Sequence, residues 1–180
     1  MATSVALLRG INVGGRNPIG MPDLAASFLA AGYQDVSTYS SSGNVLFTAD
    51  PAGGPGLEGA IERMLEERFG IPLLVVVRSR NELAEVVTSA PADHGSSELR
   101  SEVFFLKHPL TADAAFAELP ELREGVDAVA AGPGVIYFSR VAAQATTTRI
   151  TRLMSTPIFQ QMTVRTWRTT TRLSEMLDGG

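Results

Sequence analysis

Residues 5–49 read VALLRGINVGGRNPIGMPDLAASFLAAGYQDVSTYSSSGNVLFTA. The stretch opens with an apolar segment of strand length, which runs into a glycine-rich loop. Pro22 suits the first turn of the helix that follows, and Gly32 is a typical helix end. Residues 35–40 and 45–49 then have the composition of two strands joined by a short turn. The stretch therefore predicts the element order βαββ.

The next part of the chain completes that order. A glycine-rich loop precedes a helix whose apolar residues recur at helical spacing: Leu57, Ile61, Leu65 and Phe69. Glu62 on this helix is expected on its solvated face. Residues 73–77 have the composition of a buried strand, and Ser79 with Glu82 forms the capping-box pattern of a further helix. The order βαββαβ is that of the ferredoxin-like split βαβ fold.

The second half of the chain repeats this order of elements. Strands are expected at 102–107, 126–131, 135–139 and 164–168, and helical segments at 111–119, 149–154, 157–162 and 171–177. We therefore predict an α+β protein with two ferredoxin-like (βαββαβ) lobes that arise from an apparent duplication. The first lobe is expected to comprise residues 1–95 and the second lobe residues 96–180.

The 180 residues include no cysteine and no apolar run long enough for a membrane helix. The absence of cysteine excludes disulfides and thiolate metal sites, and it favours a cytoplasmic location. His94, expected in an exposed loop, and His108 are the only histidines, and neither has a partner at metal-ligand spacing. We therefore expect no metal site, no cofactor and no membrane partner. An oligomer is compatible with the sequence but is not indicated by it.

The formal net charge of −4 hides an uneven distribution of charge. Residues 1–127 carry nine basic and seventeen acidic side chains, a balance of −8. Residues 128–180 carry six arginines against two acidic residues, a balance of +4. A positive segment can attract an anionic partner even in an acidic chain. The alternative is that these arginines pair with carboxylates of the first lobe.

The strand order of a ferredoxin-like sheet, 4-1-3-2, predicts where a ligand would bind. Strands one and three are antiparallel neighbours, so the loop that leaves strand one lies beside the turn that enters strand three. This rim of the first lobe gathers glycines, guanidinium groups and polar side chains: Arg9, Asn12, Gly14, Gly15, Arg16, Asn17, Ser42, Gly43 and Asn44. Backbone N–H groups and guanidinium groups suit an anionic ligand. The alternative is that the glycines serve only tight turns.

Arg165 and Trp167 are expected two residues apart on one strand, and therefore on one face of it. An indole beside a guanidinium group can stack a nucleobase, whereas the alternative is that the tryptophan packs a seam between subdomains. The favoured function is the binding of a small anionic ligand, phosphorylated or nucleotide-like, at the rim. The alternatives are an RNA-binding module that uses the arginine-rich second lobe, and a purely structural or protein-interaction role. The spacing identifies no catalytic base or nucleophile, so enzyme activity stays open.

Several segments resemble an uncharacterised bacterial family, domain of unknown function 1697. They are Leu7–Gly15, Met21–Leu24, Thr38–Tyr39, Ser42–Val45 and, near the other end of the chain, Thr163–Thr169. The resemblance implies a duplicated ferredoxin-like architecture and no established activity. The sequence departs from the family pattern at Arg16, where members usually carry lysine, and at Thr166, where many carry asparagine. The first change keeps the charge, and the second weakens a bidentate amide role before the tryptophan.

Overall fold

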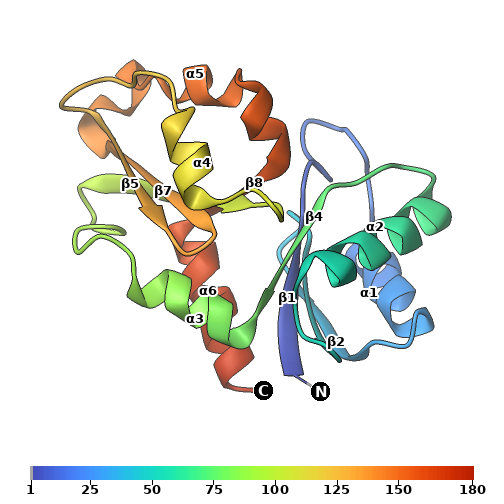
Figure 1. The fold of residues 1–180 in the computed structure, drawn as a ribbon. Coiled ribbons are helices and arrows are strands. Elements are labelled where there is room, and N and C mark those ends of the chain that lie inside the picture. Colours follow the sequence, from blue (N-terminus) through green and yellow to red (C-terminus); the bar gives the residue numbers. More distant parts are fainter. Residues whose placement is uncertain (1) are drawn as a thin grey trace. The chain divides into compact units, whose positions relative to one another are not determined.

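The computed structural model describes residues 2–180 and contains two four-stranded antiparallel sheets, each accompanied by helices (Figure 1). The predicted α+β class with two ferredoxin-like lobes is thereby confirmed. Among the described residues, no helix combines the length and the apolar character that a membrane span requires.

The chain divides into two compact units. The first unit comprises Met1–Leu83 and Leu173–Gly180, and the second comprises Ala84–Arg172. These ranges differ from the predicted lobes, which meet between residues 95 and 96. Residues 84–95 group with the second sheet, and the end of the last helix groups with the first, so the first unit is built from two separate stretches of chain.

The first unit contains one sheet with the strand order β2-β3-β1-β4, which confirms the predicted order 4-1-3-2. Its elements are β1 (Ala2–Leu8), α1 (Met21–Ala30), β2 (Gln34–Tyr39), β3 (Asn44–Ala49), α2 (Pro55–Phe69) and β4 (Val75–Ser79), with α3 (Arg80–Thr88) following. Strand β4 starts two residues later than the sequence predicts. The predicted capping box of α3 is confirmed, because Glu82 accepts a hydrogen bond from the Ser79 N–H at 2.7 Å and Ser79 Oγ accepts one from the Glu82 N–H at 3.3 Å.

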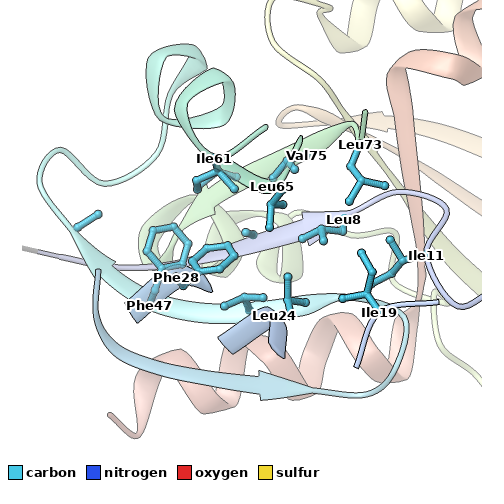
Figure 2. Packing of buried hydrophobic residues seen from close by; sticks show 14 residues of the cluster. Leu8, Ile11, Ile19, Leu24, Phe28, Phe47, Ile61, Leu65, Leu73 and Val75 are labelled. Atoms are coloured by element: carbon cyan, nitrogen blue, oxygen red, sulfur yellow. The ribbon is translucent and has the colours of Figure 1, made fainter. Parts of the chain in front are cut away.

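Helices α1 and α2 cover one face of this sheet, and their apolar side chains meet those of the strands (Figures 1 and 2). Leu24 and Phe28 of α1 and Ile61 and Leu65 of α2 are fully buried there. The ring centroids of Phe28 and Phe47 lie 5.3 Å apart. Burial of each such side chain contributes about 1.5–3 kcal/mol, so this core is the main source of the unit's stability.

Carboxylates of α2 close the outer edge of β4. Glu62 Oε1 accepts a hydrogen bond from the Val75 N–H at 2.9 Å, and Glu58 Oε1 accepts one from the Val77 N–H at 3.0 Å. Glu58 also lies 3.5 Å from the guanidinium group of Arg78, and both of these side chains are almost fully buried. The expectation that Glu62 faces solvent is therefore wrong, because an edge strand presents N–H groups that need acceptors.

The second unit repeats this topology with the strand order β6-β7-β5-β8. Its elements are β5 (Leu99–Leu106), α4 (Ala112–Ala117), β6 (Asp127–Gly132), β7 (Val135–Val141), η1 (Ala142–Thr147), α5 (Ile150–Met154), η2 (Pro157–Gln161) and β8 (Met162–Thr166). Helix α6 (Trp167–Asp178) follows β8 directly.

The predicted strand 164–168 is wrong at its end, because the chain turns into α6 at Trp167. Thr166 caps this helix: its Oγ1 accepts a hydrogen bond from the Thr169 N–H at 3.2 Å. Arg165 and Trp167 therefore belong to different elements and do not share a strand face.

Candidate functional site

The rim of the first unit forms as the strand order predicts. The Leu8 N–H donates to the Gly43 carbonyl at 2.9 Å, and the Arg9 N–H donates to the Leu74 carbonyl at 3.0 Å. The Asn12 side chain reaches the Ser41 carbonyl at 2.9 Å. The loop after β1, the turn into β3 and the start of β4 therefore meet at one end of the sheet.

The amide side chains of the rim bind the protein's own backbone. Asn12 Oδ1 accepts from the Ile19 N–H at 2.8 Å, and its Nδ2 donates to the Ile19 carbonyl at 2.9 Å. Asn17 Nδ2 donates to the Gly10 carbonyl at 3.0 Å. Asn44 is buried and its Nδ2 donates to the Tyr39 carbonyl at 2.8 Å and to Ser42 Oγ at 3.0 Å. These amides fix the shape of the loop and the turn.

Gly14 and Gly15 occupy the two central positions of a tight turn. Their φ angles are 56° and 76°, and the Arg16 N–H donates to the Val13 carbonyl at 2.9 Å. A turn with left-handed backbone at both central positions strongly favours glycine. Arg16 is exposed beside this turn, and Arg9 is half-buried, which lowers its pKa through desolvation. The two arginines are thus the cationic groups that the rim offers to a ligand.

A second candidate site lies in the second unit, where a hollow of about 420 Å³ opens at one end of the sheet. We name it the arginine hollow and define it by the side chains that give it its chemistry: Arg100, Glu102, Arg140, Thr166, Trp167 and Arg168. The start of β5, the end of β7 and the junction between β8 and α6 supply these residues. The hollow therefore combines an indole with three guanidinium groups.

Two of these arginines are direct neighbours on adjacent strands of the sheet. Arg100 of β5 lies directly opposite Arg140 of β7 in the ladder, a pairing of like charges that is unfavourable by itself. Glu102 lies 3.4 Å from Arg140, whose guanidinium carbon is 6.0 Å from the centroid of the Phe138 ring. Arg100 and Arg168 are exposed. With three guanidinium groups and one carboxylate, the hollow is positive and suits an anion.

The backbone of the segment before β5 fixes the position of the tryptophan. A Cβ atom built on Gly95 would lie 2.2 Å from Trp167 Cδ1, so the indole packs directly on this backbone. The His94 imidazole lies edge-to-face with the indole, with ring centroids 4.8 Å apart. His94 is half-buried, so the expectation that it lies in an exposed loop is wrong.

Arg165, which the sequence groups with Trp167, lies buried on β8. Its Nη1 donates to Thr163 Oγ1 at 2.9 Å and to the Val164 carbonyl at 2.8 Å. Burial lowers the pKa of Arg165 to about 10. The arginines that accompany Trp167 are instead Arg100, Arg140 and Arg168, and sequence reasoning did not single out this group. Among the described residues, no cluster of three or more His, Asp or Glu side chains could hold a metal ion.

Comparison with known proteins identifies the family. A family model described as protein of unknown function (DUF1697) matches residues 1–137. The chain belongs to the DUF1697 family. This DUF1697 protein is similar in structure to the conserved bacterial protein SP0830 from Streptococcus pneumoniae, with a TM-score of 0.85 and 23% sequence identity over 98% of each chain. That likeness establishes a shared fold. No curated protein matches the sequence.

The capping geometry explains one departure of this DUF1697 protein from its family's pattern. The resemblance described in the sequence analysis implies asparagine in many members where Thr166 stands, and the structure shows that this position caps α6. Asparagine and threonine are both good N-cap residues. The exchange therefore keeps the local structure that places Trp167 at the hollow.

Proposed function

We propose that this DUF1697 protein binds a small phosphorylated ligand of the nucleotide type in the arginine hollow. The observation that carries the proposal is the grouping of Trp167 with three guanidinium groups around about 420 Å³ of space. A space of this size falls within the usual range of small-ligand sites. An indole can stack a base, and guanidinium groups can hold a phosphate with two parallel hydrogen bonds.

Each side chain of the hollow has a role in this proposal. Arg100 and Arg168 are exposed and act as the phosphate ligands. Arg140 is held by Glu102 and presents a guanidinium group with little freedom. The Glu102 carboxylate accepts a hydrogen bond from a donor on the ligand, such as a sugar hydroxyl. The proposal concerns binding and assigns no catalytic group, and the cysteine-free sequence supports a cytoplasmic setting for it.

The rim of the first unit is the second location proposed for the same class of ligand. Its cations are Arg9 and Arg16, and its amides are engaged with the backbone of the loop. Fewer polar groups therefore remain for a ligand at the rim than in the arginine hollow. Substitutions of Arg16 and of Arg100 separate the two locations.

The test is a ligand panel read by the melting temperature. Nucleoside mono- and diphosphates, sugar phosphates and inorganic phosphate are added to the protein. A ligand at about one hundred times its Kd stabilises the folded state by about 2.7 kcal/mol, which raises the melting temperature. The double variant Arg100→Ala, Arg168→Ala is expected to lose this rise.

Two further variants serve as controls for the panel. Arg63→Ala removes an exposed arginine of α2 and is expected to leave the rise unchanged. Arg16→Ala is expected to leave it unchanged as well, and a loss there instead would place the ligand at the rim. A melting temperature that no ligand of the panel changes would contradict the proposal.

Single-stranded RNA is a second candidate ligand for the same surface. Trp167 lies beside the exposed Arg100 and Arg168, and base stacking next to cations is how proteins hold single strands. If RNA binds, its affinity falls steeply between about 50 and 200 mM salt and drops further in Trp167→Ala. Nucleotide binding without oligonucleotide binding leaves the small ligand as the function. If neither binds, the structural or interaction role is the remaining candidate.

A further inference from the structure

His94 contacts the tryptophan of the arginine hollow without being one of the residues that line it. The planes of the two rings are 86° apart at a centroid distance of 4.8 Å. The same imidazole contacts Tyr137 of β7 at 5.4 Å. The next residue, Gly95, also packs directly on the indole. A change in the position of His94 would therefore change the packing of Trp167.

The surroundings of the His94 Nε2 atom favour the neutral ring. One ring nitrogen is hydrogen-bonded to the backbone of Glu102. The other, Nε2, is buried and has no hydrogen-bond partner among the described residues. The bond to Glu102 therefore assigns the proton of the neutral ring to Nδ1. Protonation would place a charged N–H at Nε2 with no acceptor, which is costly in a buried position.

Other groups around the imidazole do not remove this cost. Asp93 is the charged side chain that acts on the imidazole, Tyr137 contacts the ring, and Glu85 of α3 acts on Tyr137. Helix α6, whose Trp167 contacts the imidazole, also carries Arg168, Arg172, Glu175 and Asp178, and the sheet carries Arg100, Glu102 and Arg140. Desolvation lowers the pKa of His94, while the hydrogen bond to the Glu102 backbone and the charge of Asp93 raise it by less. Burial raises the pKa of Tyr137 to about 12, so this phenol stays neutral.

We propose that His94 is a positioning residue: its neutral imidazole holds the Trp167 indole in the orientation that binds the ligand, and protonation releases it. The ligand part of this proposal rests on the proposed function, whereas the link between His94 and Trp167 does not. Because the pKa of His94 lies below the ordinary 6.5, the neutral form prevails at neutral pH and is lost in acid.

Ligand binding and the protonation of His94 are coupled in this proposal. The sign of that coupling distinguishes the proposal from a simple attraction between the ligand and a charged imidazole. A ligand that selects the neutral form lowers the pH at which His94 titrates. An anion that merely attracts the imidazolium would raise that pH. The two mechanisms therefore shift the same midpoint in opposite directions.

The first experiment uses the protein without ligand. Trp167 is the only tryptophan in the chain, so tryptophan fluorescence reports on its surroundings, which include His94. A titration from about pH 8 to about pH 5 is expected to show one transition with a midpoint below 6.5. The transition is expected to disappear in His94→Phe and to persist in His108→Asn, which removes the other histidine. A flat profile in the wild type, or a transition that survives in His94→Phe, would overturn the proposal.

If the His94→Phe variant does not fold, an NMR titration of the wild-type protein tests the link between His94 and Trp167. The imidazole signals of His94 are followed by NMR and are expected to titrate with the same midpoint as the Trp167 fluorescence. A His94 titration whose midpoint differs from that of the fluorescence would overturn the proposal.

The second experiment adds cyclic uridine monophosphate, a phosphodiester whose own charge does not change over this range of pH. Its affinity is expected to fall about tenfold at one pH unit below the midpoint, because only about a tenth of the protein is then competent to bind. The ligand is also expected to lower the fluorescence midpoint, and a raised midpoint would overturn the proposal. No binding of this probe or of any ligand of the panel at any pH, with the fluorescence transition intact, would contradict the proposed function but support the His94–Trp167 switch.

Discussion

Gly43 lies in the turn that leads into β3 and has a φ of 89°. A Cβ atom at this position would lie 2.8 Å from Ile11 Cδ1 and 2.9 Å from Leu8 Cβ. The backbone conformation and the close packing both exclude a side chain. At this residue the rim has a structural reason for its glycine that is independent of any ligand.

Gly43→Ala is therefore expected to destabilise the protein by about 2–4 kcal/mol, because backbone strain and overpacking both act. Urea unfolding followed by circular dichroism measures the change. Gly56→Ala is the matched control: a Cβ atom there would meet no other part of the structure within 4 Å, and Gly56 lies in the first turn of α2, so the change should be neutral or slightly stabilising. Equal stability of the two variants would contradict the packing argument.

Glu58 is a second residue whose loss should be costly. Its carboxylate accepts from the Val77 N–H and faces the buried Arg78. Glu58→Ala leaves a buried guanidinium group without this partner, which typically costs about 3–5 kcal/mol. Glu66→Ala, at an exposed position of the same helix, is expected to change the unfolding free energy by less than about 0.5 kcal/mol. Thermal and urea unfolding of the two variants check this difference.

At the scale of elements, periodicity predicted most of the architecture. The first helix after Pro22, the apolar repeat of α2, the capping box of α3 and the strand order 4-1-3-2 all appear in the structure. One clear error lies at Trp167, because the predicted strand 164–168 begins and ends two residues later than β8. The hydroxyl of Thr166 caps a helix there instead, and a single threonine in a threonine-rich segment is a weak signal.

The candidate site was predictable only in part. The juxtaposition at the rim follows from strand order, which the sequence pattern reveals. The arginine hollow depends on the ladder register that places Arg100 opposite Arg140, and on the helix that brings in Trp167. Uneven charge pointed to the segment that holds Arg140 and Arg168 but not to Arg100, and register between distant strands depends on packing that a single sequence does not display.

The cap of α6 gives a prediction at this scale. Thr166→Ala is expected to cost about 1 kcal/mol, because the Thr169 N–H loses its acceptor. Thr166→Asn, which introduces the residue common in the family, is expected to retain most of the stability. Thermal unfolding gives the free energies, and Trp167 fluorescence shows whether the start of α6 has loosened. A loss in Thr166→Asn as large as in Thr166→Ala would argue against capping.

At the scale of the whole molecule, the two units share a buried arginine at equivalent positions of their sheets. Arg78 lies opposite Val5 in the first sheet, and Arg165 lies opposite Val103 in the second. Each of these buried arginines donates from Nη1 to the carbonyl of the residue before it, at 2.9 Å and 2.8 Å. The matching positions and matching bonds support the duplication that the element order predicted.

The divided first unit leads to a prediction about cooperativity. Leu173 is fully buried and belongs to the first unit, although it is distant from β1 to β4 in the sequence. Leu173→Ala is expected to cost about 2–5 kcal/mol. Hydrogen exchange should then accelerate more in β1–β4 than in β5–β8. Asp178→Ala removes an exposed ion pair with Arg80 and should cost no more than about 1 kcal/mol. Equal acceleration in both sheets would contradict the assignment of Leu173.

The same division has a consequence for biosynthesis. During translation the residues of β1–β4 leave the ribosome long before Leu173–Gly180, which complete their unit. The first unit therefore lacks its second stretch until nearly all of the remaining chain has been made, whereas Ala84–Arg172 is one continuous stretch. A nascent chain stalled just before Leu173 should thus be cleaved by proteases within β1–β4 faster than the full-length chain.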